Sequence, residues 1–202
     1  MIRNLVFDFG GVLLDWNPHY VYDDYFGSRE QADWFLANVT TMAWNGLMDL
    51  GRTFSECVAE LQAQWPEWAE AIAVYQSRWF EMIGGEVEGM PQLLADLDRL
   101  GVPLYGLTNW SMETFPRVRA GHSLFRHFRG IVVSAEEGVA KPDQRLYRIL
   151  LDRYGLQAGE SLFIDDNRDN VEGARRVGME GWQFTGAADL RVVLRQRMGL
   201  QL

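Results

Sequence analysis

The feature that most constrains this chain is a single carboxylate inside an apolar run. Residues 5–14 are apolar or glycine except for Asp8. An apolar run without alternation is typical of an inner strand of a parallel sheet, because such a strand is covered on both faces. An ionised carboxylate there requires a partner. Gly10 and Gly11 follow, so we expect the chain to turn tightly and a ligand to approach the backbone at the end of this strand.

The same run could be interpreted as a secretory signal. Asp8 lies in its middle, only Arg3 precedes it as a basic residue, and no small-residue cleavage site follows. The single cysteine, Cys57, cannot form an internal disulfide, and no apolar stretch approaches the roughly 18 residues of a membrane helix. We therefore expect a soluble, cytoplasmic protein.

The net charge of −9 is concentrated in one segment. Residues 15–83 hold 11 acidic residues and 3 arginines, whereas the rest of the chain holds 17 acidic and 16 basic residues. An acidic surface repels phosphate backbones, so we do not expect nucleic acid or anionic membranes as partners. The acidity could equally serve only the solubility of a helical region.

Residues 17–85 have the apolar spacing of helices and no β-branched apolar runs. Thr53 and Glu56 form a capping-box pattern in front of one apolar stripe, and a helix is also expected over residues 30–46. We predict that residues 17–85 form an inserted helical domain. Its two clearest stripes are Phe54, Val58, Leu61 and Trp65, then Trp68, Ile72, Tyr75, Trp79 and Met82. A buried helix face suffices to explain them.

After a flexible passage that begins at residues 84 and 85, strand and helix patterns alternate. This alternation predicts an α/β fold, a three-layer, doubly wound parallel sheet built from residues 1–16 and 86–202. Strands are expected at residues 103–107, 131–133, 162–164 and 182–184, and helices over about 91–100, 111–119, 143–154, 169–177 and 188–197.

Polar side chains follow the strand at the N-terminus and the strands at residues 103–107, 131–133 and 162–164. Because the carboxyl ends of parallel strands meet at one edge, we expect these side chains to converge there. Three carboxylates in one cleft would repel one another unless a cation joined them, and oxygen ligands suit Mg²⁺. The residues are Asp8, Thr108, Asn109, Lys141, Asp165 and Asp166. An EF-hand loop starting at Asp165 is excluded, because Asn170 and Arg176 stand where such loops carry Gly and Glu.

Lys141 is the only lysine among 19 basic residues, which suggests a chemical role for it. With Thr108 and Asn109 it could bind a phosphoryl group that the metal neutralises from the other side, and Asp8 could then attack phosphorus. Other interpretations stay open. The Thr108–Asn109 and Asp165–Asp166 pairs could cap the helices that follow, and we assign Asp169 and Asn170 mainly to capping.

Four motifs together resemble the haloacid dehalogenase-like (HAD) superfamily. They are residues 7–12 (FDFGGV), 107–109 (LTN), 141–142 (KP) and 163–167 (FIDDN), the last followed by Asp169 and Asn170. The helical insertion resembles the C1 cap of subfamily I. In finer detail the motifs are similar to those of the bacterial glucose-1-phosphate phosphatase-like branch.

The resemblance implies that Asp8 is a nucleophile and that Mg²⁺ is held by Asp8, the Gly10 carbonyl and Asp166, with support from Asp165. It also implies phosphate contacts from Thr108, Asn109 and Lys141. We add Gly11, because ligands can approach its backbone, and Trp110, which with Trp16 could form an apolar wall for the substrate body.

One departure concerns the proton donor. Phosphatases of the superfamily usually carry a second Asp two residues after the nucleophile, and here that position is Gly10. A water molecule or a cap residue must then transfer the proton. His19 is one candidate, whereas His122 and His127 are expected to be structural.

We therefore predict a Mg²⁺-dependent phosphatase that hydrolyses a small-metabolite phosphomonoester, such as a sugar phosphate, through an aspartyl-phosphate intermediate. We expect a monomer or weak homo-oligomer whose partner is the small phosphorylated metabolite. Two alternatives remain: a metal-free 2-haloacid dehalogenase with Asp8 as nucleophile, and a non-catalytic phosphate-binding HAD domain.

Overall fold

The computed structural model describes residues 1–201 and contains a parallel sheet of five strands. Its order is β5-β4-β1-β6-β7, and every neighbouring pair is parallel. The strands are β1 (Asn4–Phe7), β4 (Leu104–Thr108), β5 (Gly130–Val133), β6 (Ser161–Asp165) and β7 (Glu180–Gln183). The chain winds outward from β1 to β5 and then returns to the other side of β1, so the topological switch point lies beside β1.

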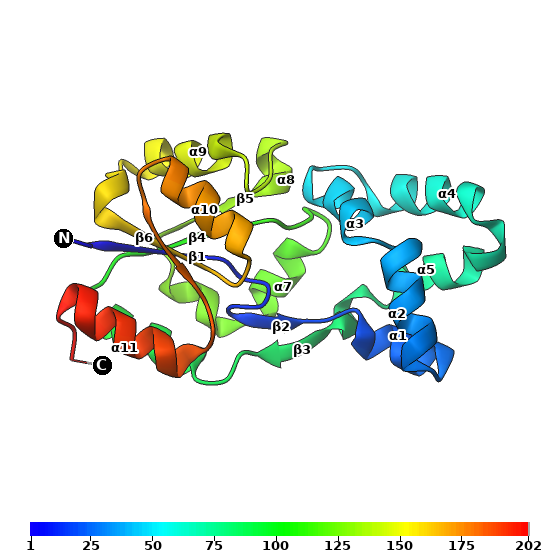
Figure 1. The fold of residues 1–202 in the computed structure, drawn as a ribbon, viewed down its shortest axis with the longest axis horizontal. Coiled ribbons are helices and arrows are strands. Elements are labelled where there is room, and N and C mark those ends of the chain that lie inside the picture. Colours follow the sequence, from blue (N-terminus) through cyan, green and yellow to red (C-terminus); the bar gives the residue numbers. More distant parts are fainter. Residues whose placement is uncertain (202) are drawn as a thin grey trace.

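Helices cover both faces of the sheet (Figure 1), which confirms the predicted three-layer α/β fold. Alternate side chains of β1 enter different cores. Leu5 and Phe7 belong to the core that includes α6 (Met90–Arg99) and α11 (Ala187–Met198). Val6 belongs to the core that includes α9 (Gln144–Tyr154) and α10 (Arg168–Arg176). Burial on both faces explains why the strand has no polar alternation.

Beyond Phe7 the apolar run does not continue as one strand. After a turn, β2 (Leu14–Trp16) pairs antiparallel with β3 (Ile83–Glu86), and this ribbon carries the chain to the helical lobe and back (Figure 1). The flexible passage predicted to run from residue 84 to residue 91 is therefore wrong at its start, because strand pairing orders residues 84–86. A Cβ at Gly84 would lie 2.7 Å from the Tyr20 ring, so glycine lets β3 pass close to α1 (His19–Phe26).

Besides α1, the helical lobe contains α2 (Arg29–Asn38), α3 (Met42–Asp49), α4 (Phe54–Gln64) and α5 (Ala69–Ser77). Short 3₁₀ turns at Pro66–Trp68 and Trp79–Met82 flank α5. The predicted capping box is present, with Thr53 accepting a hydrogen bond from the Glu56 N–H. The domain limits of 17–85 for the cap stay a prediction.

The single helix expected over residues 30–46 is wrong, because the chain breaks between α2 and α3. Residues 39–41 are β-branched, and Thr41 is extended, with its side chain accepting a hydrogen bond from the Trp44 N–H. This cap starts a new helix. The new direction of α3 brings its C-terminal residue, Asp49, toward the sheet.

The remaining helices are α7 (Phe115–Gly121) and α8 (Ser134–Glu137), with short turns at Ser123–His127 and Ala158–Glu160. Helix α7 begins later than the predicted residue 111, because residues 112–114 form a turn in which Ser111 Oγ accepts from the Glu113 N–H. Among residues 1–201, no helix combines the length and the apolar character needed to cross a membrane.

Candidate active site

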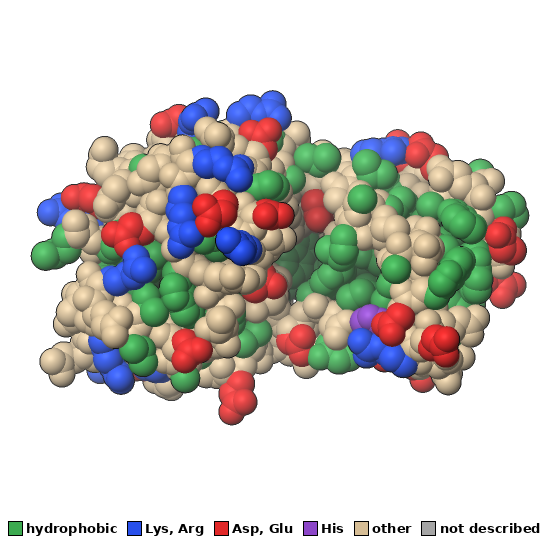
Figure 2. Space-filling view, in the orientation of Figure 1, with side chains coloured by type: hydrophobic (Ala, Val, Ile, Leu, Met, Phe, Trp, Pro, Cys, Tyr) green, Lys and Arg blue, Asp and Glu red, His purple; other side chains and the backbone are tan. Residues whose placement is uncertain are grey.

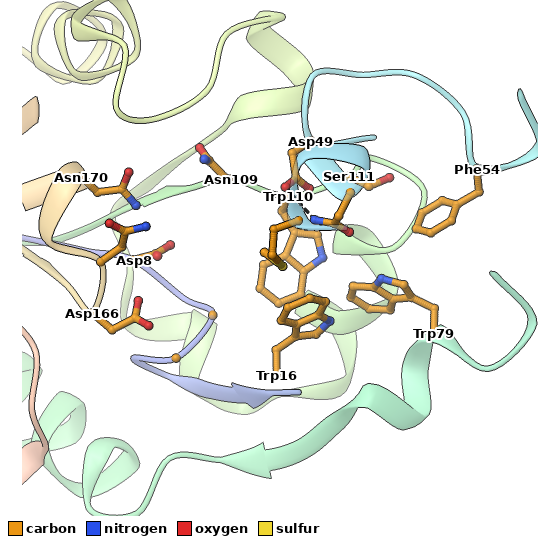
Figure 3. A pocket seen from close by; sticks show the side chains of 15 residues that line it. Asp8, Trp16, Asp49, Phe54, Trp79, Asn109, Trp110, Ser111, Asp166 and Asn170 are labelled. Atoms are coloured by element: carbon orange, nitrogen blue, oxygen red, sulfur yellow. Dashed lines mark hydrogen bonds between the residues drawn. The ribbon is translucent and has the colours of Figure 1, made fainter. Parts of the chain in front are cut away.

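A pocket of about 370 Å³ lies at the carboxyl ends of β1, β4 and β6. Figure 2 shows the corresponding hollow between the sheet-containing part of the molecule and the helical lobe. Figure 3 shows its two sides, with Asp8, Asp166 and Asn170 on one and tryptophans on the other. The predicted convergence of strand ends is therefore present, since Asp8 follows β1, Thr108 ends β4 and Asp165 ends β6.

Lys141 joins two of the carboxylates. Its Nζ lies 2.8 Å from Asp8 Oδ1 and 2.7 Å from Asp165 Oδ2, and its side chain is fully buried. Burial alone would lower the pKa of Lys141, but the charges of Asp165 and Asp8 raise it above its usual value. The only lysine of the chain is thus a buried cation of the site rather than an exposed loop residue.

Asp8 is held in a fixed orientation. Its Oδ1 accepts a hydrogen bond from the Phe9 N–H at 2.7 Å in addition to the contact with Lys141. Burial raises the pKa of Asp8 to about 7, with Lys141 opposing and Asp165 reinforcing the shift. A second cation at the site would favour the ionised form that a nucleophile requires.

Asn109 positions Lys141. Its Oδ1 accepts from the Lys141 backbone N–H at 2.8 Å, and its Nδ2 donates to the Lys141 carbonyl at 3.0 Å. The second N–H of the amide is left for a ligand, and Asn109 lines the pocket. The residue is therefore at the predicted place, but much of its hydrogen-bonding capacity serves the loop that carries Lys141.

Asp165 is completely buried and its oxygens have several partners. They accept from the Asn167 N–H at 2.8 Å and from Asn170 Nδ2 at 3.1 and 3.2 Å, besides the Lys141 ammonium. The capping role assigned to Asn170 is wrong. Asn167 is the N-cap of α10, whereas Asn170 lies in the first turn with its side chain directed to Asp165.

Oxygens of Asp8, Asp165 and Asp166 lie within 4.8 Å of one another, as the ligands of one metal ion would. Partial burial and the charge of Asp165 raise the pKa of Asp166, so the cluster favours a cation. Gly11 makes room for it. This residue has a φ of +72°, and a Cβ there would lie 2.5 Å from Asp166 Oδ2. Three carboxylates are suitable ligands for a hard cation. Asp165 already accepts more hydrogen bonds than the other two.

Thr108 carries an unsatisfied hydroxyl. The residue is fully buried, and within the described chain its Oγ1 has no hydrogen-bond partner. A buried hydroxyl without a partner costs about 1–3 kcal/mol. Thr108 is not among the residues that line the pocket, so its contact with phosphate stays a prediction.

The opposite wall of the pocket is largely aromatic. Trp110 is fixed by hydrogen bonds from its backbone N–H to Ser134 Oγ and from its Nε1 to Thr114 Oγ1, each 3.0 Å long. Its ring centroid lies 5.8 Å from that of Trp79. The residues that form this wall are Trp16, Met42, Phe54, Trp79 and Trp110. Trp16 and Trp110 were predicted here, whereas helical periodicity had assigned Phe54 and Trp79 to the cap core.

Sequence reasoning missed Asp49 and named His19 as one candidate proton donor. Asp49 lies at the end of α3 and lines the pocket. Burial raises its pKa to about 7, against the opposing charge of Lys141. His19 does not line the pocket, because its Nδ1 lies 2.8 Å from Asp23 and its Nε2 3.4 Å from Asp33. No motif marked Asp49, since its position depends on the break before α3.

Comparisons with known proteins agree with this geometry. Residues 2–178 match the family of haloacid dehalogenase-like hydrolases. A sesquiterpene phosphatase, astK of Aspergillus oryzae, is 29% identical over 194 residues, which cover 96% of this chain and 95% of that protein.

Two solved structures share the fold at lower identity. A HAD family enzyme of Bacteroides thetaiotaomicron, in complex with magnesium and inorganic phosphate, has a TM-score of 0.70 at 20% identity, covering 96% of this chain and 100% of the other. The L-2-haloacid dehalogenase of Xanthobacter autotrophicus has a TM-score of 0.65 at 18% identity, covering 98% and 84%. The glucose-1-phosphate phosphatase-like branch stays a prediction. By its motifs, its fold and the family match over most of its length, the chain belongs to the haloacid dehalogenase-like hydrolases.

Proposed function

We propose that this protein is a Mg²⁺-dependent phosphatase that hydrolyses a small phosphomonoester through an aspartyl-phosphate on Asp8. The observation that carries the proposal is the buried Lys141 ammonium between Asp8 and Asp165, two members of the carboxylate cluster. A relative that matches nearly the whole chain is named a phosphatase. We further propose a cytoplasmic monomer or weak homo-oligomer.

Mg²⁺ would be held by Asp8 and Asp166, with the Gly10 carbonyl as a further ligand, and would neutralise negative charge on the phosphoryl group. Lys141 and Thr108 would bind the phosphoryl oxygens from the other side, and Asn109 would hold Lys141 in place. Asp165 would keep the Lys141 ammonium charged and oriented. Its own oxygens are already bonded, so we propose that it supports the site rather than reacts.

Asp8 would act as the nucleophile. A carboxylate oxygen forms a bond to phosphorus while the bond to the leaving oxygen breaks, and water then attacks the same phosphorus and releases phosphate. The contacts of Asp8 Oδ1 with the Phe9 N–H and Lys141 fix the carboxylate before substrate arrives. This preorganisation reduces the entropic cost of reaching the reactive geometry.

The aromatic wall favours a substrate with an apolar body. A sugar needs partners for several hydroxyl groups, but Asn45 is already bonded to Tyr75 and Asp49, and Ser111 Oγ accepts from the Glu113 N–H. Three tryptophans, a phenylalanine and a methionine offer mainly apolar contact. The name of the sesquiterpene phosphatase agrees with such a substrate. A sugar phosphate remains the alternative to be compared with it.

A substrate panel tests the proposal. Phosphate release should be measured from an alkyl phosphate, a prenyl monophosphate, glucose 1-phosphate and p-nitrophenyl phosphate, with Mg²⁺ and again with a chelator. We expect turnover that requires Mg²⁺ and is most efficient with the apolar esters. Metal-independent halide release from a 2-haloacid would indicate the dehalogenase alternative, and phosphate binding without turnover would indicate a non-catalytic domain.

A further inference from the structure

The proposed reaction lacks a proton donor at the usual place. When the bond from phosphorus to an alkyl oxygen breaks, the leaving alkoxide is strongly basic and needs a proton. Gly10 has no side chain to supply one. Of the described residues that line the pocket, only Asp8, Asp49 and Asp166 are titratable, and two of these are already assigned to the nucleophile and the metal. Asp49 is the remaining acid.

Asp49 lies across the pocket from Asp8. It projects from the end of α3 on the cap side, as Figure 3 shows, with Asp8 on the opposite side. A leaving group that departs in line from Asp8 moves toward the cap. The backbone of Asp49 is also tied to the core, because its carbonyl accepts a hydrogen bond from Ser134 Oγ, and Ser134 itself accepts from the Trp110 N–H.

A chain of hydrogen bonds orients the Asp49 carboxyl group. Tyr75 OH donates to Asn45 Oδ1 at 2.7 Å, and Asn45 Nδ2 donates to Asp49 Oδ2 at 3.0 Å. In the part of the chain that the structure describes, no group is hydrogen-bonded to the other oxygen, Oδ1. Because Oδ2 already accepts a bond, Oδ1 is the oxygen on which a proton is best placed.

The surroundings allow this group to be protonated at neutral pH. Burial raises the pKa of Asp49 to about 7, although the Lys141 charge lowers it. The charge of Asp49 also acts on Tyr75. Burial raises the pKa of Tyr75 well above its usual value, and the Asp49 charge raises it further. An acid with a pKa near the working pH can both give and take a proton.

We propose that Asp49 is the general acid and base of this enzyme, which rests on the proposed phosphatase function. Its proton passes to the leaving oxygen as that oxygen separates from phosphorus and Asp8 becomes phosphorylated. The Asp49 carboxylate then takes a proton from the attacking water as the bond between phosphorus and Asp8 breaks. Asp49 is protonated again, and phosphate leaves.

Asp49→Asn tests this with two leaving groups. Hexyl phosphate needs a proton on its departing oxygen, whereas p-nitrophenolate leaves without one. For the variant we expect kcat/KM with hexyl phosphate to fall by about 10²- to 10³-fold and kcat/KM with p-nitrophenyl phosphate to change little. Because the second step also needs the base, p-nitrophenol should appear as a burst followed by a slow steady state.

Two further variants make the test specific. Asp33→Asn is the matched control, because Asp33 is an exposed carboxylate of the same lobe outside the pocket. This variant should leave kcat/KM unchanged with both esters. Asp49→Ser should repeat the pattern of Asp49→Asn, which guards against a folding defect in one variant. Thermal unfolding of each variant checks that it is folded.

The outcomes are distinguishable. Equal losses of kcat/KM with both esters would assign Asp49 a structural role and overturn the proposal, as would unchanged hydrolysis of hexyl phosphate. If the wild-type protein released phosphate from neither ester, the proposed function itself would be wrong, and the role of Asp49 would be rejected with it.

Discussion

The two sides of the pocket are built differently. On the core side, Lys141, Asp165, Asn170 and Asn109 form a network in which nearly every polar atom has a partner. On the cap side, where Trp16 and Trp110 of the sheet-containing part join residues of the helical lobe, the wall is aromatic, and its one ionisable group, Asp49, has a single side-chain hydrogen bond, from Asn45. We infer that the two sides have different roles. The core side binds and transfers the phosphoryl group, whereas the cap side selects the leaving group and supplies its proton.

The largest effect should come from removing the charge that holds the core side together. Lys141→Met leaves Asp8 and Asp165 buried without their cation, and such a loss costs about 3–5 kcal/mol of unfolding free energy. Urea denaturation measures it. Arg145→Met is the control, because Arg145 and Asp143 form an exposed pair and should contribute at most about 1 kcal/mol. Equal effects of the two variants would show that the core network is not the more tightly coupled side.

A smaller effect should separate substrate selection from phosphate binding. In Trp79→Leu the aromatic wall loses contact area, so we expect KM for apolar phosphomonoesters to rise by about 10-fold. Inhibition by inorganic phosphate should stay unchanged, because phosphate binds on the core side. Trp34→Leu, which changes a half-exposed tryptophan outside this pocket, should alter neither quantity. Weaker inhibition by phosphate in Trp79→Leu would contradict the division between the two sides.

The smallest effect concerns the stability cost of Asp49. Its folded-state pKa is raised above the value of 3.8 expected for an unfolded chain. The contribution of the Asp49 carboxyl group to folding stability is therefore fully present below pH 3.8 and is lost as the pH rises through about 7. Asn does not titrate, so Asp49→Asn should gain roughly 1 kcal/mol of stability relative to wild type between pH 6 and pH 7. Denaturant unfolding at both pH values measures this, and a gain that is independent of pH would contradict the raised pKa.

The core side could be predicted from the sequence because parallel strands follow a simple rule. Asp8, Thr108, Lys141 and Asp165 are distant in the chain, but each follows or ends a recognisable strand, so their convergence needs no detailed geometry. Their partners were harder to predict. Asparagine is a common helix-capping residue, so the sequence favours that role for Asn170. Its position on the inner side of α10 instead directs its side-chain amide to Asp165.

The cap side could not be predicted in the same way. Helical periodicity shows that Trp79 and Phe54 lie on apolar faces, but it does not show whether such a face meets the cap core or the pocket. Asp49 reaches the pocket only because the chain breaks at residues 39–41 and α3 takes a new direction. The ribbon of β2 and β3 was missed because two adjacent glycines resemble a flexible linker.

Covalent chemistry at Asp8 can be tested by trapping the phosphoenzyme. The wild-type protein and Asp8→Asn should be mixed with p-nitrophenyl phosphate, with Mg²⁺ or with a chelator, quenched in acid within milliseconds and examined by peptide mass spectrometry. We expect one phosphoryl group on the peptide that contains Asp8, only in the wild-type protein and only with Mg²⁺. Metal-dependent phosphate release by Asp8→Asn at the wild-type rate, with no phosphorylated peptide in either protein, would contradict Asp8 as the nucleophile.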